Sequence, residues 1–343
     1  MKSLATALLC LSIAACGART SLAPFGEDAG SSAPPGTDAS SAIVTACGDE
    51  ERAYCTLRNQ CTGGASITYH YGTLEECVSR ESAACVRDLG APQNARGASN
   101  AEGCAAAYPS QSCTDYWDGN TPAACRALSG PRANGSACGV NSQCASTFCG
   151  APSGSMCGTC QEPPLAGTPC QSGSQCWYNL SCPLVAPSIE GSCTPWVSVA
   201  GSCDDYNLCE GGFSCIGADA EAGIMGTCEP SISEMGASCN YSTGPGCDVR
   251  LYLYCESGTC QPEPMVTAGA GCDLNGSAYL PLCEAGGLCA TSGAGTSGTC
   301  VAPANDGAPC DLDSIPCLPG AACVTTGGGT AGTCVFADPS SCG

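Results

Sequence analysis

Cysteine is the residue type that could carry the most chemistry in this chain. There are 36 cysteines among 343 residues: two lie in the N-terminal apolar stretch, and the other 34 run from Cys47 to Cys342. A thiolate is a nucleophile, a redox centre or a metal ligand. An even set at this density, however, is typical of a disulfide framework formed in an oxidising compartment. We therefore expect these cysteines to hold the chain together, and we predict no catalytic residue, no cofactor and no enzyme activity.

The segment Cys157-Gly158-Thr159-Cys160 is the one pair whose spacing suits redox chemistry. A reactive dithiol needs a lowered thiolate pKa, which generally comes from a helix N-terminus in a strand–helix–strand unit. The surrounding sequence shows no such unit, so the pattern favours a structural role. A thiol–disulfide redox protein using Cys157 and Cys160 stays an alternative hypothesis.

Other residues with chemical potential are few. His70 is the only histidine, and one histidine cannot build a zinc site with cysteines that are needed as disulfides, so we interpret it as a loop residue. Residues 273–276 (DLNG) and 311–313 (DLD) resemble fragments of calcium loops without reaching the full ligand pattern. The sequence predicts no metal site, and Ca²⁺ is the only ion that it leaves open.

Charge limits the class of partner. The formal net charge is −21, no lysine follows Lys2, and nine arginines stand against 31 acidic residues. Such a surface repels polyanions, so we expect no nucleic-acid partner. A protein or glycan of unknown identity is the partner that the composition allows.

The N-terminus indicates export. Lys2 precedes an apolar stretch, Leu4 to Ala15, that is too short to span a bilayer. The run Leu11-Ser12-Ile13-Ala14-Ala15-Cys16 resembles a bacterial lipobox. The resemblance implies that residues 1–16 form a lipoprotein signal with Cys16 as the lipidated residue, on a protein held by its lipid at the outer membrane or cell surface. An ordinary secretory signal cut after Ala18 is the alternative.

The segment 17–42 is rich in Gly, Ala, Ser and Pro. Such a composition cannot bury a core, so it predicts a flexible tether.

Residues 43–130 contain eight cysteines at spacings that suit helices. Eight residues cover slightly more than two helical turns, so two cysteines at that spacing lie near one face. Cys47 and Cys55 have this spacing, as do Cys77 and Cys85, which predicts an antiparallel helical hairpin with bridges Cys47–Cys85 and Cys55–Cys77.

Capping signals bound the expected helices. Thr73-Leu74-Glu75-Glu76 is a capping box that predicts a helix to about Leu89, with Gly90 as its stop. Residues 99–102 (SNAE) form a second capping box, and Pro109 would end the short helix that it opens. An earlier helix is expected from about Ala46 to Gln60.

Residues 134–343 form an internal repeat of six units, starting near 134, 166, 199, 235, 268 and 306. Each unit opens on a small residue, Gly or Ala and a cysteine, and closes on Gly-Thr/Ser-Cys. A unit below about 40 residues needs staples to fold. The fold class predicted is therefore small and disulfide-rich: a disulfide-stapled α-helical module followed by a tandem array of small irregular or β-hairpin repeats, which we expect to be elongated.

The second and third cysteines bracket five residues in four of the units. The middle residue is always one that tolerates positive φ, which predicts a tight turn between two half-cystines. These residues are Asn179, Gly212, Gly286 and Gly320.

The cysteine order over residues 138–193 resembles the Dickkopf N-terminal cysteine-rich domain, most specifically at Cys157-x-x-Cys160 and between Cys176 and Cys182. It departs from that family in having a single Cys176 where the family has an adjacent pair, and in lacking its basic linker. This leaves Cys157 as an odd member. Cys342 is the other cysteine outside the pattern, so a Cys157–Cys342 bridge is a candidate. We carry over the fold that the resemblance implies and not the signalling role.

The two-part layout of the whole chain is also similar to that of uncharacterised cysteine-rich lipoproteins of myxobacteria and related δ-proteobacteria. We therefore expect a non-enzymatic, lipid-anchored envelope protein that presents a stapled repeat array for binding or as a spacer. A protease inhibitor is an alternative, because disulfide scaffolds often display rigid inhibitory loops.

Overall fold

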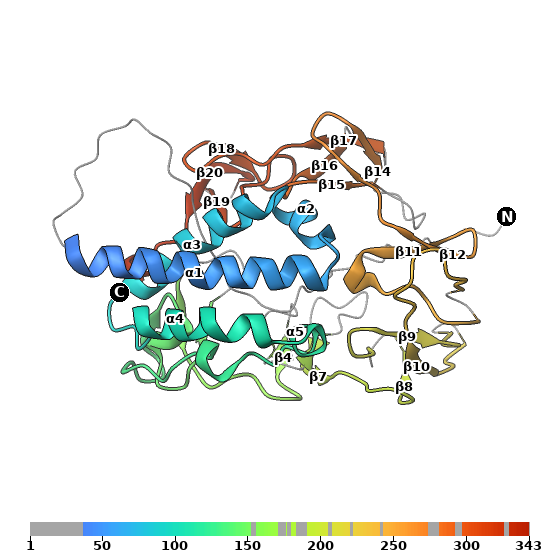
Figure 1. The fold of residues 1–343 in the computed structure, drawn as a ribbon, viewed down its shortest axis with the longest axis horizontal. Coiled ribbons are helices and arrows are strands. Elements are labelled where there is room, and N and C mark those ends of the chain that lie inside the picture. Colours follow the sequence, from blue (N-terminus) through green and yellow to red (C-terminus); the bar gives the residue numbers. More distant parts are fainter. Residues whose placement is uncertain are drawn as a thin grey trace.

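The computed structural model describes residues 37–342, except 152–155, 171–175, 177–179, 183–190, 205–207, 220–221, 241–242, 274–280, 292–296 and 326–328. A layer of helices occupies the middle of the molecule, and small strand units follow one another along its lower side, its right end and its upper side (Figure 1). The fold is small and disulfide-rich, with a helical module followed by hairpin sheets, as the sequence predicts. The expectation of an elongated array is wrong, because the units wrap around the helices.

Two antiparallel helices form the expected hairpin. They are α1 (Thr37–Cys61) and α3 (Leu74–Gly90). The first begins at Thr37 rather than near Ala46, so the end of the expected tether is helical. The short helix α2 (Ala65–Tyr71) occupies what the sequence predicts as a loop, and it contains His70.

The helix ends show which capping signals operate. The Thr73 hydroxyl accepts a hydrogen bond from the Glu76 backbone N–H at 3.1 Å, as expected at the start of α3. Gly90 is the last residue of that helix and not its stop. α4 (Ala98–Ala107) begins after Gly97, earlier than predicted, because the Asn100 side chain accepts from the Gly97 N–H at 3.0 Å.

The rest of the module consists of short pieces: a 3₁₀ turn over Tyr108–Ser110, α5 (Cys113–Trp117) and a 3₁₀ turn over Ala123–Cys125. Its interior is divided into small buried clusters, each built on half-cystines. They are centred on Cys47 with Cys85, on Cys55 with Cys77, and on Cys61 with Cys104. The staples therefore take the place of one continuous core.

Units 1, 3, 5 and 6 each contain a three-stranded antiparallel sheet in which the closing strand lies in the middle. Units 2 and 4 contain two-stranded pieces, and β13 pairs in parallel with β15. The strands are β1 (Ala137–Cys138), β2 (Cys149–Gly150), β3 (Gly158–Cys160), β4 (Pro169–Cys170), β5 (Leu180–Ser181), β6 (Gly191–Ser192), β7 (Thr194–Pro195), β8 (Ser202–Cys203), β9 (Phe213–Ile216), β10 (Gly226–Pro230), β11 (Leu253–Glu256), β12 (Thr259–Pro262), β13 (Met265–Val266), β14 (Gly271–Asp273), β15 (Leu282–Cys283), β16 (Leu288–Thr291), β17 (Ser297–Val301), β18 (Pro309–Asp311), β19 (Ala321–Thr325) and β20 (Ala331–Phe336).

All six units share one disulfide connectivity. The first cysteine of a unit bonds to the third, and the second bonds to the fourth. The pairs are 138–149 and 144–160, 170–182 and 176–193, 203–215 and 209–228, 239–255 and 247–260, 272–289 and 283–300, and 310–323 and 317–334.

Each unit opens on a turn that the closing cysteine holds. In unit 6, the Gly307 N–H donates to the Cys334 carbonyl at 2.7 Å, and the Cys334 N–H donates to the Ala308 carbonyl at 2.9 Å. The equivalent residues repeat this pair of bonds in every unit. The turn residue has positive φ throughout, and it is glycine except at Ala200, whose φ is 62°. The opening turn of each unit is thus a rigid feature.

The predicted turns between the second and third cysteines are confirmed where they are described. Gly212, Gly286 and Gly320 have φ of 90°, 74° and 89°. Asn179 lies outside the described residues.

Candidate functional site

The predicted lipidation site, Cys16, and the calcium-like residues 274–276 lie outside the described residues. Within the part of the chain that is described, no helix is both long and apolar enough to cross a membrane. Lipidation of Cys16 therefore stays a prediction from the sequence.

The helical module contains the two bridges that the spacing predicts. Cys47 bonds to Cys85 and Cys55 bonds to Cys77, with Cα–Cα distances of 5.5 and 6.1 Å. The remaining four cysteines form 61–113 and 104–125. Because α1 and α3 face each other along both bridges, the hairpin is fixed at two levels.

The candidate redox pair is not bonded to itself. Cys160 bonds to Cys144 inside unit 1, whereas Cys157 bonds to Cys342 across 185 residues of sequence. Gly158 begins a strand, so no helix starts between the two cysteines. In this arrangement neither sulfur is a thiol. The Cys157–Cys342 bridge acts as a covalent clasp between unit 1 and the C-terminal end.

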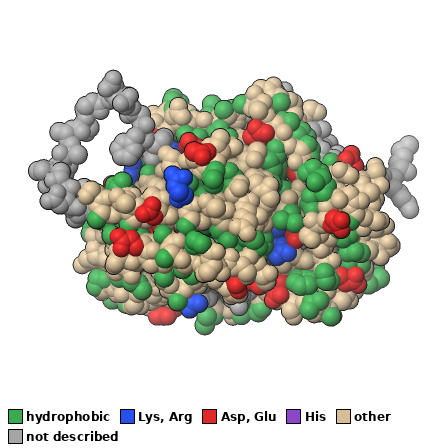
Figure 2. Space-filling model, viewed as in Figure 1, with side chains coloured by type: hydrophobic (Ala, Val, Ile, Leu, Met, Phe, Trp, Pro, Cys, Tyr) green, Lys and Arg blue, Asp and Glu red, His purple; other side chains and the backbone are tan. Residues whose placement is uncertain are grey.

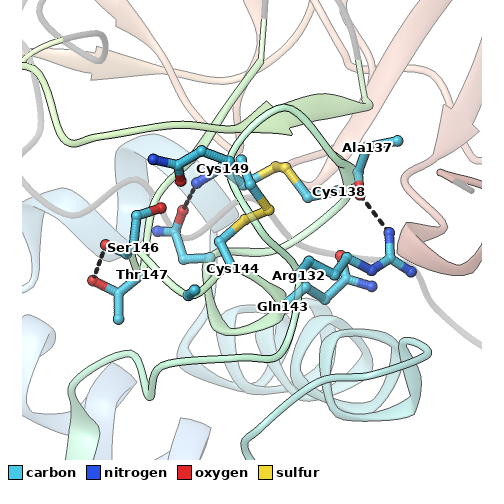
Figure 3. The surroundings of a disulfide bond; sticks show 12 residues. Arg132, Ala137, Cys138, Gln143, Cys144, Ser146, Thr147 and Cys149 are labelled. Atoms are coloured by element: carbon cyan, nitrogen blue, oxygen red, sulfur yellow. Dashed lines mark hydrogen bonds between the residues drawn. A yellow bond between two sulfur atoms is a disulfide. The ribbon is translucent and has the colours of Figure 1, made fainter.

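Unit 1 is held against the helical module by polar side chains, among them Arg132 and Gln143, which lie near the Cys138–Cys149 disulfide (Figure 3). The buried Gln143 side chain accepts from the Gly139 N–H at 2.7 Å and donates to the Pro92 carbonyl at 2.7 Å. Arg132 donates to the Gln93 side chain at 2.9 Å and to the Ala137 carbonyl. An open hollow of about 390 Å³ lies beside these groups. The Arg132 guanidinium donates to Gln93 and Ala137, and both of these residues line the hollow. We therefore interpret Arg132 as part of the structural contact between unit 1 and the helical module.

Clustered sulfur atoms recur in the described units. Trios such as Cys239, Cys247 and Cys260 have sulfurs within 4.8 Å of one another. These sulfurs are in disulfides, whereas the thiolate is the form that binds metal.

The Asp311 carboxylate is held by its own unit. It accepts from the Asp313 N–H at 3.0 Å, from the Ser314 hydroxyl at 3.1 Å and from the Thr330 hydroxyl at 2.9 Å. The bond from Thr330, followed by those from the 313–314 turn, lowers the pKa of this carboxyl. Its oxygens therefore fix the turn after β18, and this geometry gives Ca²⁺ binding no support at Asp311.

A buried ion pair joins α3 to unit 6. Arg80 is fully buried, and its guanidinium contacts the Asp306 carboxylate at 2.9 Å and donates to the Pro319 carbonyl at 2.8 Å. Phe336 lies against the same helix, with the guanidinium of Arg87 4.0 Å from its ring centroid. Asp306 belongs to the opening turn of unit 6, so this turn is a contact point inside the molecule.

The equivalent turns of units 2 to 4 point outward and have apolar side chains. Leu165, Val199 and Met235 are 68%, 55% and 64% exposed. They lie on the same rigid turn that places Asp306 against Arg80. Acidic side chains are scattered over the molecular face drawn in Figure 2, and few basic ones accompany them. We take these three turns as the candidate binding surface.

Sequence reasoning missed this surface and the Arg80–Asp306 seam. The Gly or Ala before each first cysteine marks the turns, but nothing in it says which turn faces inward. Comparison with family models, with curated proteins and with solved structures finds no match.

Proposed function

We propose that the protein is a non-enzymatic, lipid-anchored protein of the bacterial cell envelope that presents a closed, disulfide-stapled body to a protein or glycan partner. Seventeen disulfides join all 34 cysteines from Cys47 onward and place the protein in an extracellular or envelope compartment. The lipobox-like run before Cys16 and the tether supply the anchor.

The observation that supports a binding role is the opening turn. In unit 6 this turn makes a specific buried contact through Asp306, whereas in units 2 to 4 it exposes Leu165, Val199 and Met235. Binding to a preformed turn loses little conformational entropy, because the closing cysteine already fixes the backbone. A partner can therefore bury an apolar side chain on such a turn without first ordering the backbone.

Membrane anchoring is tested by intact-mass analysis and fractionation of the protein expressed in a bacterial host. The expected mature chain begins at a lipid-modified Cys16 and stays with the membrane fraction. Cys16→Ser should release it, while the matched Cys10→Ser variant should behave like the wild type. A soluble chain beginning at Arg19 would instead establish the ordinary secretory signal.

Partner binding is tested with the mature chain on protein and glycan arrays prepared from the host envelope. A triple variant, Leu165→Ser, Val199→Ser and Met235→Ser, should weaken a saturable interaction at least about tenfold, which corresponds to about 1.4 kcal/mol. Val44→Ser is the matched control, because Val44 is 53% exposed but lies on α1. Equal binding by the triple variant and the control would contradict the proposed surface.

A protease inhibitor stays a second candidate, because Leu165 follows Pro163-Pro164 in an exposed segment between Cys160 and Cys170. A segment held between two half-cystines resembles a protease substrate that is fixed in one conformation. A panel of secreted endopeptidases would show nanomolar inhibition that Leu165→Ser removes. The absence of tight inhibition across the panel would dispose of this candidate.

A further inference from the structure

The short helix α2 lies where the helical module meets units 4 and 5. The His70 Nε2 atom is 3.4 Å from the Tyr252 hydroxyl of unit 4. The Tyr69 ring lies beside both, with centroid distances of 4.7 Å to His70 and 5.7 Å to Tyr252. The only histidine of the chain is therefore at a contact between two parts of the molecule.

Backbone hydrogen bonds fasten unit 5 to the same helix. The Ala285 and Gly286 N–H groups donate to the carbonyls of Thr68 and Tyr69 at 3.0 and 2.7 Å. A Cβ atom at Gly286 would lie 3.1 Å from the His70 carbonyl oxygen, so the two backbones are in close contact. The side chains of α2 thus hold unit 4 while its last carbonyls hold unit 5.

We propose that His70 is an acid-sensitive latch, and that protonation of its imidazole releases units 4 and 5 from α2. The proposal concerns regulation and does not depend on the proposed binding partner. We call the state in which units 4 and 5 contact α2 the closed state. The proposal requires the neutral imidazole to be favoured over the protonated one in this state, and the surroundings of His70 favour the neutral form.

Burial, followed by the positive charge of Arg58, lowers the pKa of His70 to about 4. Arg58 is held in place because its guanidinium donates to the Ser66 hydroxyl at 2.7 Å, so it cannot move away when His70 becomes charged. Titratable or charged groups surround this contact on several elements. They are Tyr54 and Arg58 of α1, Tyr69 and Tyr71 of α2, Glu81 of α3 through its bond to Tyr71, Tyr116 of α5, and Tyr252 and Glu263 of unit 4.

The direction of the pH dependence of closure follows from the direction in which the pKa of His70 is shifted. Because the pKa of His70 is lower in the closed state than the usual 6.5, closure is fully favoured above pH 6.5 and weakens as the pH falls toward 4. A difference of about 2.5 pH units corresponds to a change of up to about 300-fold in the opening equilibrium. Glu263 acts in the opposite direction, since burial raises its pKa and a group that binds a proton more readily when closed favours closure in acid.

Hydrogen exchange of the mature full chain at pH 7 and pH 4, corrected for intrinsic exchange rates, measures the latch. Protection of the Ala285 and Gly286 amides should fall at least about tenfold in acid, while that of α3 should not change. The variant His70→Gln should remove the pH dependence, and Glu263→Gln should leave the fall at least as large. An equal fall in His70→Gln, or no fall in the wild type, would overturn the proposal.

A second measurement covers the outcome in which His70→Gln fails to close at any pH. Because the chain has one histidine, its imidazole gives a single set of resonances in an NMR titration. A midpoint near 4 is expected, with amide protection that declines as the pH falls from 6.5 toward that midpoint. A midpoint near 6.5 with the amides still protected would contradict the latch.

Discussion

The glycine that begins the closing Gly-Thr-Cys of units 1, 3, 5 and 6 leads to a sharp steric prediction. In unit 6, a Cβ atom added at Gly332 would lie 2.4 Å from the Val324 carbonyl oxygen on the neighbouring strand. Real Cβ atoms essentially never approach so closely. The same approach occurs at Gly158, Gly226 and Gly298, where the nearest backbone oxygen is 2.5–2.6 Å away. Glycine is required here for space and not for positive φ.

The neighbouring strand cannot move aside to accept the added methyl group. Cys323 and Cys334 face each other across β19 and β20, and each is bonded to a different cysteine of the unit. Gly332→Ala should therefore lower the free energy of unfolding by about 1–3 kcal/mol, the usual range for overpacking. For a body of this size that corresponds to a drop of about 2–5 °C in Tm.

Differential scanning calorimetry of the oxidised mature chain is the assay. Gly329→Ala is the matched control in the same unit, because a Cβ atom there meets nothing within 4 Å. The control should melt within about 1 °C of the wild type, since an unhindered surface substitution changes stability little. Equal Tm values for the two variants would refute the steric account of the closing glycine.

Three further predictions follow from single contacts. Ala200→Gly should raise the free energy of unfolding by about 0.5–1 kcal/mol, because Ala200 is the only opening-turn residue with a side chain in the left-handed region; calorimetry showing a lower Tm would contradict this. Arg80→Ala should lower the free energy of unfolding, measured with denaturant, by about 3–5 kcal/mol, because it leaves Asp306 without its ion pair. The control Arg52→Ala, at an exposed position, should change it by less than about 0.5 kcal/mol. Similar losses for both variants would argue against a stabilising Arg80–Asp306 ion pair. Replacing both Cys157 and Cys342 by serine should leave the pairing of the six units intact but speed proteolysis near the C-terminal end, and an unchanged cleavage rate would show that the clasp is dispensable.

Local chemistry explains how much of the fold could be predicted from the sequence. The spacing of Cys47, Cys55, Cys77 and Cys85 fixes two helical faces, and Gly212 marks a turn through its freedom in φ, so these features need no distant information. The start of α4 shows the limit of local rules: Ser99 and Asn100 are both good capping residues, and the structure uses Asn100.

The closed arrangement could not be predicted in the same way. It depends on Arg80 meeting Asp306 and on Cys157 meeting Cys342, partners 226 and 185 residues apart. His70 illustrates the consequence: its neighbours in the sequence favour a loop, whereas its environment comes from Arg58 on α1 and Tyr252 in unit 4. The residues before each first cysteine likewise mark the candidate binding turns in the sequence. Which of these turns is exposed depends on how the units wrap around the helices.

The central claim is that the cysteines build six identically connected units closed by one long-range clasp. Mass-spectrometric disulfide mapping of the oxidised, non-reduced chain tests it directly. The account predicts first-to-third and second-to-fourth pairs in every unit, Cys47–Cys85 and Cys55–Cys77 in the helical module, and Cys157 linked to Cys342. A Cys157–Cys160 bond, or free thiols at those positions, would contradict the clasp and revive the redox hypothesis.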